Sequence, residues 1–99
     1  MTPKNGLPAI HPGEFLREAL EESGTSQAEF ARVIGVSPIR ICHVLKGVRP
    51  VTAELALLFG LAFGQSPQYW LNLQSIHDLK TAEEAMGSRV LAVRPLAHA

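Results

Sequence analysis

The sequence predicts an all-α fold of five helices, and three observations support this prediction. Serine and threonine residues stand directly before apolar runs, where their hydroxyl groups can accept hydrogen bonds from the first free N–H groups of a helix. Glycines follow these runs, as is common where a helix ends in a left-handed conformation. Between these signals, apolar residues recur every three or four positions, which is the spacing of one helix face.

The composition is that of one globular domain. The chain has 99 residues, of which 46% are hydrophobic and 18% are charged, so it is too apolar for a disordered chain. A domain of this size is marginally stable alone, and a partner subunit would help. The formal net charge is zero, which argues against a protein that coats nucleic acid indiscriminately but allows a local basic face.

We expect a cytoplasmic protein without a metal or a cofactor. The single Cys42 excludes an internal disulfide and a cysteine-based zinc site within one chain. His11 and His77 lie far apart in the sequence, with no carboxylate at ligand spacing. The longest apolar run, residues 55–64, is far shorter than the roughly 18 residues of a membrane span. No N-terminal stretch has the pattern of an export signal.

Residues 1–10 are expected to form a flexible arm because they contain two prolines and a glycine. The first helix is predicted to begin at Pro12, since proline is favoured in a first turn, and to end at Gly24. Its acidic cluster, Glu18, Glu21 and Glu22, is interpreted either as a solvated helix face or as a contact for a basic protein.

Residues 26–49 have the pattern of two short helices joined by a tight turn. Ser26 and Glu29 fit the S-x-x-E capping box that opens a helix. Gly35 ends this helix, and Ser37 caps a second one whose first turn begins with proline. The spacing therefore predicts a helix-turn-helix motif.

The second helix of this motif has two distinct faces. Ile41, Val44 and Leu45 fall at i, i+3 and i+4 and are predicted to pack against the first helix of the motif, the one that Ser26 opens. Four other residues share a face that is free to meet a ligand: Ile39, Cys42, His43 and Lys46. Residues 26–50 carry four cationic side chains against one carboxylate, a net charge of +3 that would attract phosphates. We therefore predict that this helix enters the major groove of DNA.

Two further helices are predicted after the motif. Thr52 caps the first, whose apolar residues are so numerous that it should be mostly buried. The second, at residues 67–79, has a wider apolar surface than one packing face needs. One side is assigned to the core and part of the rest to a dimer interface that includes Trp70, Leu73 and Ile76. Trp70 could also be an anchor of the core.

The C-terminal tail, residues 81–99, allows more than one structure. Residues 81–86 could extend or restart a helix, whereas residues 89–94 have the composition of a short strand. An isolated strand cannot satisfy its own backbone, so an ordered strand would pair with a second chain, through Val90 and Val93, or with a bound partner. Disorder is the alternative.

The residues of the motif resemble the lambda-repressor-like helix-turn-helix proteins of the Cro/Xre type. The shared pattern is S-Q-x-x-x-A-x-x-x-G-V-S-x-x-x-I-x-x-x-x-x-G. The flanking segments HPGEFLREAL and SPQYWLNLQ are similar to those of HigA antitoxins, also described as VapI-type antidotes, and the resemblance covers residues 10–80. It implies a five-helix lambda-repressor-like domain at residues 11–80. It also implies a type II antitoxin that represses its own operon and neutralises an mRNA-cleaving, HigB-like toxin.

Several polar residues are candidates for phosphate contacts that set the register on DNA: Gln27, Ser37, Arg40, Lys46 and Arg49. For Gln27 the resemblance implies such a contact. Arg40 could instead pair with a carboxylate on its own surface.

The candidates for contacts to base edges are Pro38, Ile39, Cys42 and His43, and the resemblance points to residues 38, 39 and 43. Pro38 and Ile39 cannot form the bidentate hydrogen bonds by which Arg, Asn or Gln read a base. Specificity is therefore expected from a thymine-methyl contact of Ile39, a hydrogen bond of His43 and the shape of the DNA. The partner would be a palindromic operator bound by a homodimer.

Other functions remain as alternatives. A transcription regulator without a toxin partner would have the same motif, and a protein-interaction module that has lost DNA binding would fit the apolar Pro38 and Ile39. An enzyme is not expected, since no Ser-His-Asp arrangement, paired catalytic carboxylates or phosphate-binding glycine loop is recognisable.

Overall fold

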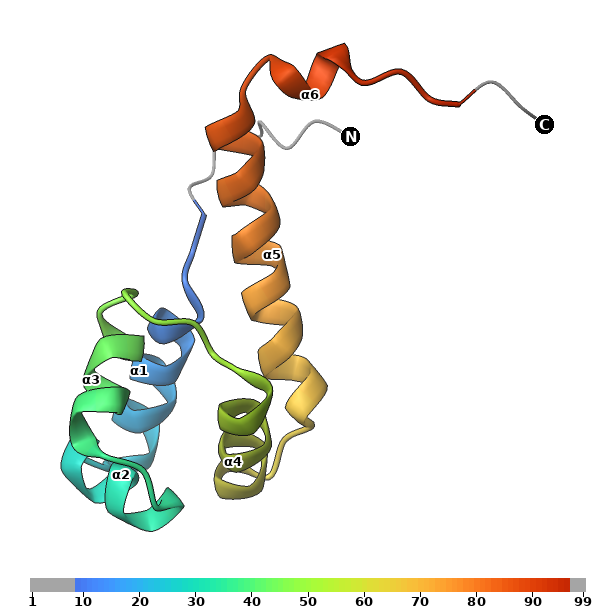
Figure 1. Ribbon diagram of the computed structural model, residues 1–99. Coiled ribbons are helices and arrows are strands. Elements are labelled where there is room, and N and C mark those ends of the chain that lie inside the picture. Colours follow the sequence, from blue (N-terminus) through green and yellow to red (C-terminus); the bar gives the residue numbers. More distant parts are fainter. Residues whose placement is uncertain (1–8, 97–99) are drawn as a thin grey trace.

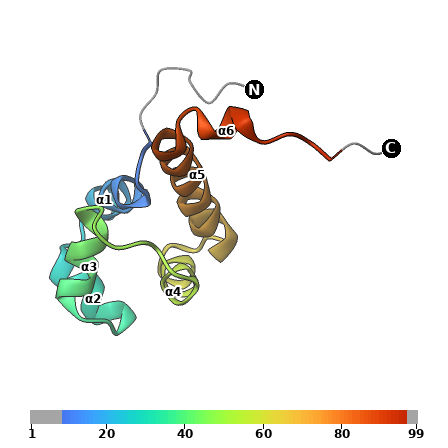
Figure 2. The ribbon, with the colours of Figure 1, turned by 45° about the horizontal axis from the view of Figure 1, so that its top comes forward.

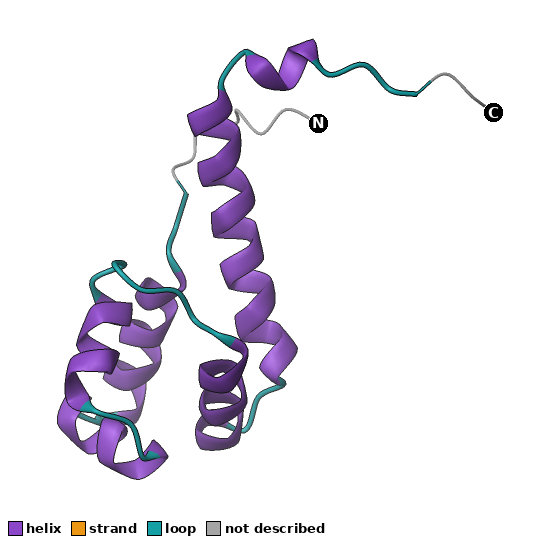
Figure 3. Cartoon of the chain, in the orientation of Figure 1, coloured by secondary structure: helices purple, strands orange, loops and turns teal. Residues whose placement is uncertain are grey.

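The structure, a computed structural model, describes residues 9–96, and every regular element in this range is a helix (Figures 1 and 3). The elements are α1 (Pro12–Ser23), α2 (Gln27–Ile34), α3 (Pro38–Leu45), α4 (Ala53–Phe63), α5 (Pro67–Met86) and α6 (Arg89–Ala92). The predicted all-α fold with five main helices is confirmed, and α6 is a short addition. The predicted arm, apart from residues 9 and 10, lies outside the described residues.

Side-chain caps open the five main helices where the sequence predicts them. Ser26 Oγ accepts a hydrogen bond from the Glu29 N–H group at 3.1 Å, and Ser37 Oγ accepts one from Arg40 at 3.3 Å. Thr52 and Ser66 cap α4 and α5 in the same way. The cap of α1 is the imidazole of His11, whose Nδ1 accepts a hydrogen bond from the Gly13 N–H group at 2.9 Å. Free N–H groups that need an acceptor therefore fix the helix starts.

The core lies where α1, α2 and α3 meet α4 and the first half of α5, and Figure 2 shows the first three helices grouped beside the other two. An aromatic cluster occupies its centre, with the ring centroids of Phe59 and Trp70 5.1 Å apart and those of Phe30 and Phe63 5.1 Å apart. The other buried hydrophobic residues are Leu16, Leu20, Ala31, Ile41, Val44, Leu45, Val51, Leu55 and Ala56.

The assignment of Trp70 to a dimer interface is wrong. Its side chain is only 1% exposed, and its indole Nε1–H donates to Gln65 Oε1 at 2.8 Å within the same chain. A side chain this deeply buried cannot contact a second subunit. Leu73 is half-buried against the same core, whereas Ile76 is 60% exposed and points away from it.

The helix α5 continues beyond the predicted end at residue 79 to Met86, so its second half extends past the core (Figure 1). The predicted strand at residues 89–94 is wrong, because residues 89–92 form α6. The Val90 N–H group donates to Gly87 O at 3.3 Å and the Leu91 N–H group to Ser88 O at 3.0 Å. These local bonds satisfy backbone groups that a strand could satisfy only with a second strand. None of the described helices is long and apolar enough to cross a membrane.

Candidate nucleic-acid interface

The α2–turn–α3 unit has the two faces that the sequence predicts. Ile41, Val44 and Leu45 of α3 are buried, and Ala31 of α2 is fully buried where the two helices approach each other. Gly35 has a φ of 77°, a left-handed conformation that favours glycine, and lets the chain turn directly into α3. The apolar inner face thus packs α3 onto the domain, and its other face is left open.

The open face of α3 carries the predicted base readers. Ile39 is 59% exposed, and Pro38 is also exposed in the first turn. Cys42 and His43 are half-buried, and Lys46 is exposed at the C-terminal end of the helix. The position of Ile39 and His43 on one surface agrees with their predicted spacing.

A groove beside α3 brings together five of the nine predicted DNA contacts: Ser37, Ile39, Arg40, His43 and Arg49. Its other wall is the segment that leads into α4, including Pro50 and Thr52. Ser37 Oγ accepts the capping bond from Arg40, but a hydroxyl group also has a hydrogen that it can donate to a phosphate. Pro38 and Cys42 of α3 and Lys46 at its C-terminal end do not line this groove, and Gln27 lines a different pocket.

Arg40 makes the alternative contact that the sequence left open. Its Nη2 atom lies 2.8 Å from Glu54 Oε1 in the first turn of α4, and the two side chains are 38% and 67% exposed. An ion pair this exposed to solvent contributes little to stability. The pair does, however, place the guanidinium beside the groove, where its other N–H groups can donate.

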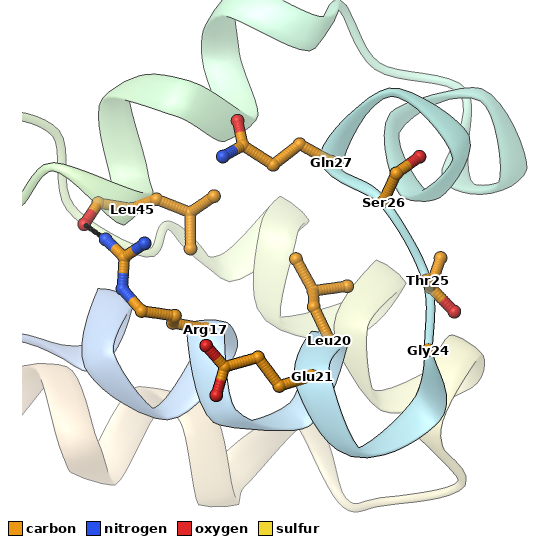
Figure 4. A pocket seen from close by; sticks show the side chains of 8 residues that line it. All are labelled: Arg17, Leu20, Glu21, Gly24, Thr25, Ser26, Gln27 and Leu45. Carbon is orange, nitrogen blue, oxygen red and sulfur yellow. Dashed lines mark hydrogen bonds between the residues drawn. The ribbon is translucent and has the colours of Figure 1, made fainter.

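Gln27 lies at the N-terminal end of α2 and lines a pocket between α1, α2 and the end of α3 (Figure 4). Arg17 of α1 enters the same pocket and donates a hydrogen bond from Nη2 to the backbone carbonyl of Leu45 at 3.0 Å. Arg17 could not be found from the sequence, because this contact joins residues 28 positions apart and no local pattern marks it.

The two histidines that are remote in the sequence lie together in the structure. The ring centroids of His11 and His77 are 4.9 Å apart, and His77 Nδ1 is 3.3 Å from Asp78 Oδ1. Burial lowers the pKa of His11 from its ordinary value of 6.5, and the charge of His77 acts in the same direction. Within residues 9–96, no group of three or more His, Cys, Asp or Glu residues could hold a metal ion.

The side chain of Gln74 on α5 supports the segment that follows α3. Gln74, which is only 8% exposed, accepts a hydrogen bond from the Val51 N–H group at 2.7 Å and donates one to Asp78 at 2.9 Å. Val51 leads directly from the groove into α4. The wall of the groove that leads into α4 is therefore held by a polar contact from α5.

The fold and this surface define a helix-turn-helix DNA-binding protein. The family model HTH_3, described as helix-turn-helix, matches residues 16–70. The chain is 46% identical to virulence-associated protein I of Dichelobacter nodosus over 82 residues, which are 82% of this chain and 76% of that protein. It is 31% identical to antitoxin HigA-1 of Vibrio cholerae, with 88% of this chain and 83% of that protein covered.

The solved structure of Pseudomonas aeruginosa antitoxin HigA with the higBA promoter superposes with a TM-score of 0.85 at 38% identity, covering 90% of this chain and 99% of that one. The chain belongs to the HigA antitoxins of the helix-turn-helix family.

Proposed function

We propose that this protein represses its own operon by inserting α3 into the major groove of an operator. The observation that carries the proposal is the open face of α3, where exposed Ile39 and half-buried His43 stand among the cationic side chains of Arg40, Lys46 and Arg49. Cations neutralise phosphates whatever the base sequence, whereas groups aimed at base edges discriminate. The binding of the P. aeruginosa relative to a promoter supports this proposal.

Each predicted contact has a specific role in the proposed complex. Gln27, Ser37, Lys46 and Arg49 bind phosphates and set the register of α3, and Arg40, held by Glu54, joins them at the edge of the groove. Ile39 packs on a thymine methyl group, and His43 makes a single hydrogen bond to a base edge. Pro38 and Cys42 contribute shape at this surface but no bidentate hydrogen bond.

The functional unit that we propose is a homodimer on a palindromic operator, with two α3 helices in successive major-groove turns about 34 Å apart. The exposed apolar residues Ile76, Val90 and Val93 lie on α5 and the segment after it, away from α3. An interface there would leave both α3 helices free. Trp70 takes no part in it, and Leu73 supports it from the core side.

The proposed partner protein is a ribosome-dependent, mRNA-cleaving HigB-like toxin encoded in the same operon. Membership of the HigA family supports this part of the proposal. The acidic residues Glu18, Glu21 and Glu22 are all exposed on α1 and suit a basic partner. Both activities place the protein in the cytoplasm, with operator DNA and the ribosome.

Fluorescence anisotropy of the purified protein tests the repressor function. A duplex from the region upstream of its own gene is titrated across a salt series, with a scrambled duplex of the same length and composition as the control. We expect operator binding at least about 10³-fold tighter than scrambled binding at physiological salt. His43→Ala should cost about 0.5–1.5 kcal/mol on the operator only, as for one hydrogen bond. Ile39→Ala should cost about 1 kcal/mol there, as for the apolar contact with one methyl group. Equal binding to both duplexes would refute sequence-specific repression.

A further inference from the structure

The last residue of α3, the helix proposed to enter the major groove, contacts a side chain of α1. The Arg17 side chain reaches across from α1 and donates from Nη2 to the carbonyl oxygen of Leu45, the last residue of α3, at 3.0 Å (Figure 4). A helix leaves its last four carbonyl groups without partners inside the helix, so each of them needs another donor.

The other three terminal carbonyls of α3 are satisfied by the chain that follows directly. Cys42 O accepts from the Lys46 N–H group at 3.0 Å, His43 O from Val48 at 3.0 Å, and Val44 O from Gly47 at 3.0 Å. Among the residues that the structure describes, the guanidinium of Arg17 is the donor to Leu45 O. The last carbonyl group of α3 thus takes its hydrogen bond from a distant residue.

Gly13, one turn before Arg17 on α1, adds to this contact. A Cβ atom at Gly13 would overlap the carbonyl oxygen of Val44, so the two backbones approach more closely than any other residue would allow. Positions 13 and 17 lie on the same face of a helix. Gly13 leaves room for the carbonyl group of Val44, and Arg17 binds the next one, that of Leu45.

We propose that Arg17 is a positioning residue for sequence recognition: by holding Leu45 O it fixes the angle at which α3 leaves the domain and presents Ile39 and His43. This inference rests on the proposed repressor function. A methyl contact and a single hydrogen bond are both short-range, and they lose most of their energy when the side chain moves by about an ångström. The long cationic side chains of Lys46 and Arg49 can follow a phosphate after such a shift. Loss of the Arg17 contact therefore reduces operator preference more than general affinity for DNA.

The neighbouring Gln27 raises a different role for Arg17, since a phosphate bound by Gln27 would also attract the guanidinium. The two roles give different results. A phosphate contact adds the same binding energy on every sequence. Its removal reduces the slope of log affinity against log salt concentration by about one. A positioning residue changes the ratio of operator to scrambled affinity and leaves the salt dependence as it is.

The test compares wild type, Arg17→Met and Arg17→Lys on the operator and scrambled duplexes, with folding checked by circular dichroism. For Arg17→Met we expect the operator preference to fall about tenfold, as for loss of one charge-assisted hydrogen bond, while scrambled binding and the salt slope stay at the wild-type values. Arg17→Lys keeps a charged donor on a more flexible side chain, and its operator preference should fall about threefold. The matched control is Arg32→Met, an exposed arginine of α2 that should keep the wild-type preference.

Three results would contradict this role. An unchanged preference in folded Arg17→Met would mean that the Leu45 contact does not orient α3. An equal loss on both duplexes with a smaller salt slope would make Arg17 a phosphate contact instead. If Arg17→Met does not fold, an unchanged preference in Arg17→Lys would refute the inference. A wild-type protein without operator preference would instead refute the proposed function itself, which separates the two failures.

Discussion

At the scale of single residues, His11 does three things at once. It caps α1 through Nδ1, its ring contacts His77, and it forms a hydrogen bond with the backbone of Arg49, just after α3. A protonated Nδ1 cannot accept the capping bond, so the folded state needs the neutral ring. Burial and the charge of His77 lower the pKa of His11, and they outweigh the hydrogen bond with Arg49 and the charges of Asp78 and Glu14, which favour protonation.

This lowered pKa predicts a loss of stability in mild acid. Above the unfolded value of 6.5 the ring is neutral in both states, and below it the unfolded chain binds the proton more readily than the folded one. The free energy of unfolding should therefore decrease as the pH falls from 6.5 through the folded pKa. Urea unfolding of wild type and His11→Asn at pH 7.5 and pH 5.5 measures this, because asparagine keeps a cap without titrating. An equal decrease in both proteins would show that His11 is not the cause.

At the scale of elements, the contact between α1 and α3 explains why Gly13 stands in the first turn of a helix. Replacing glycine by alanine in a helix normally stabilises it by up to about 1 kcal/mol. At this position the new Cβ atom would meet the backbone of Val44, which cannot rotate away. Overpacking of this kind costs about 1–3 kcal/mol, so Gly13→Ala should lower the free energy of unfolding.

Thermal and urea unfolding of Gly13→Ala check this prediction, with Glu18→Ala, an exposed position of the same helix, as the control for helix propensity. Glu18→Ala should change stability by less than about 0.5 kcal/mol. A Gly13→Ala protein as stable as wild type would mean that α1 and α3 can separate slightly without cost.

The helices show which information was available in the sequence. Ser26, Ser37 and Thr52 mark helix starts by short-range hydrogen bonding, so these starts could be predicted. The inner and outer faces of α3 follow from its period alone. The segment at residues 89–92 misled the prediction because β-branched residues favour a strand only where another strand supplies partners. In the single chain, local hydrogen bonds form α6 instead.

Contacts between distant segments could not be predicted in the same way. The bond from Arg17 to Leu45 and the ring contact of His11 with His77 exist only because α1 packs against both α3 and α5. The width of the apolar surface was also misleading. It predicted that α4 is mostly buried, yet Leu57 and Leu61 are 55% and 81% exposed. Periodicity gives the direction of a side chain but not the presence of a neighbour.

At the scale of the whole molecule, two groups of exposed apolar side chains lie away from α3. Leu57 and Leu61 are on α4, whereas Ile76 and Leu79, 60% and 66% exposed, are near the middle of α5. From there α5 extends past the core (Figure 1). The second group continues toward Val90 after the end of α5. A dimer formed there would join two chains and keep both α3 helices open to DNA.

The corresponding prediction compares one substitution by aspartate on α5 with one on α4. Ile76→Asp would bury a charge in the proposed interface, so light scattering after gel filtration should show a monomer where wild type is a dimer. Because linking two half-site contacts raises affinity by on the order of 10² or more, operator binding should weaken by a similar factor. Leu61→Asp is the matched control, with the same change at an exposed leucine of α4, and should remain a dimer that binds the operator like wild type. If Ile76→Asp is still a dimer and Leu61→Asp is a monomer, the subunits associate through α4, and the geometry that presents two α3 helices to DNA must be rebuilt around that helix.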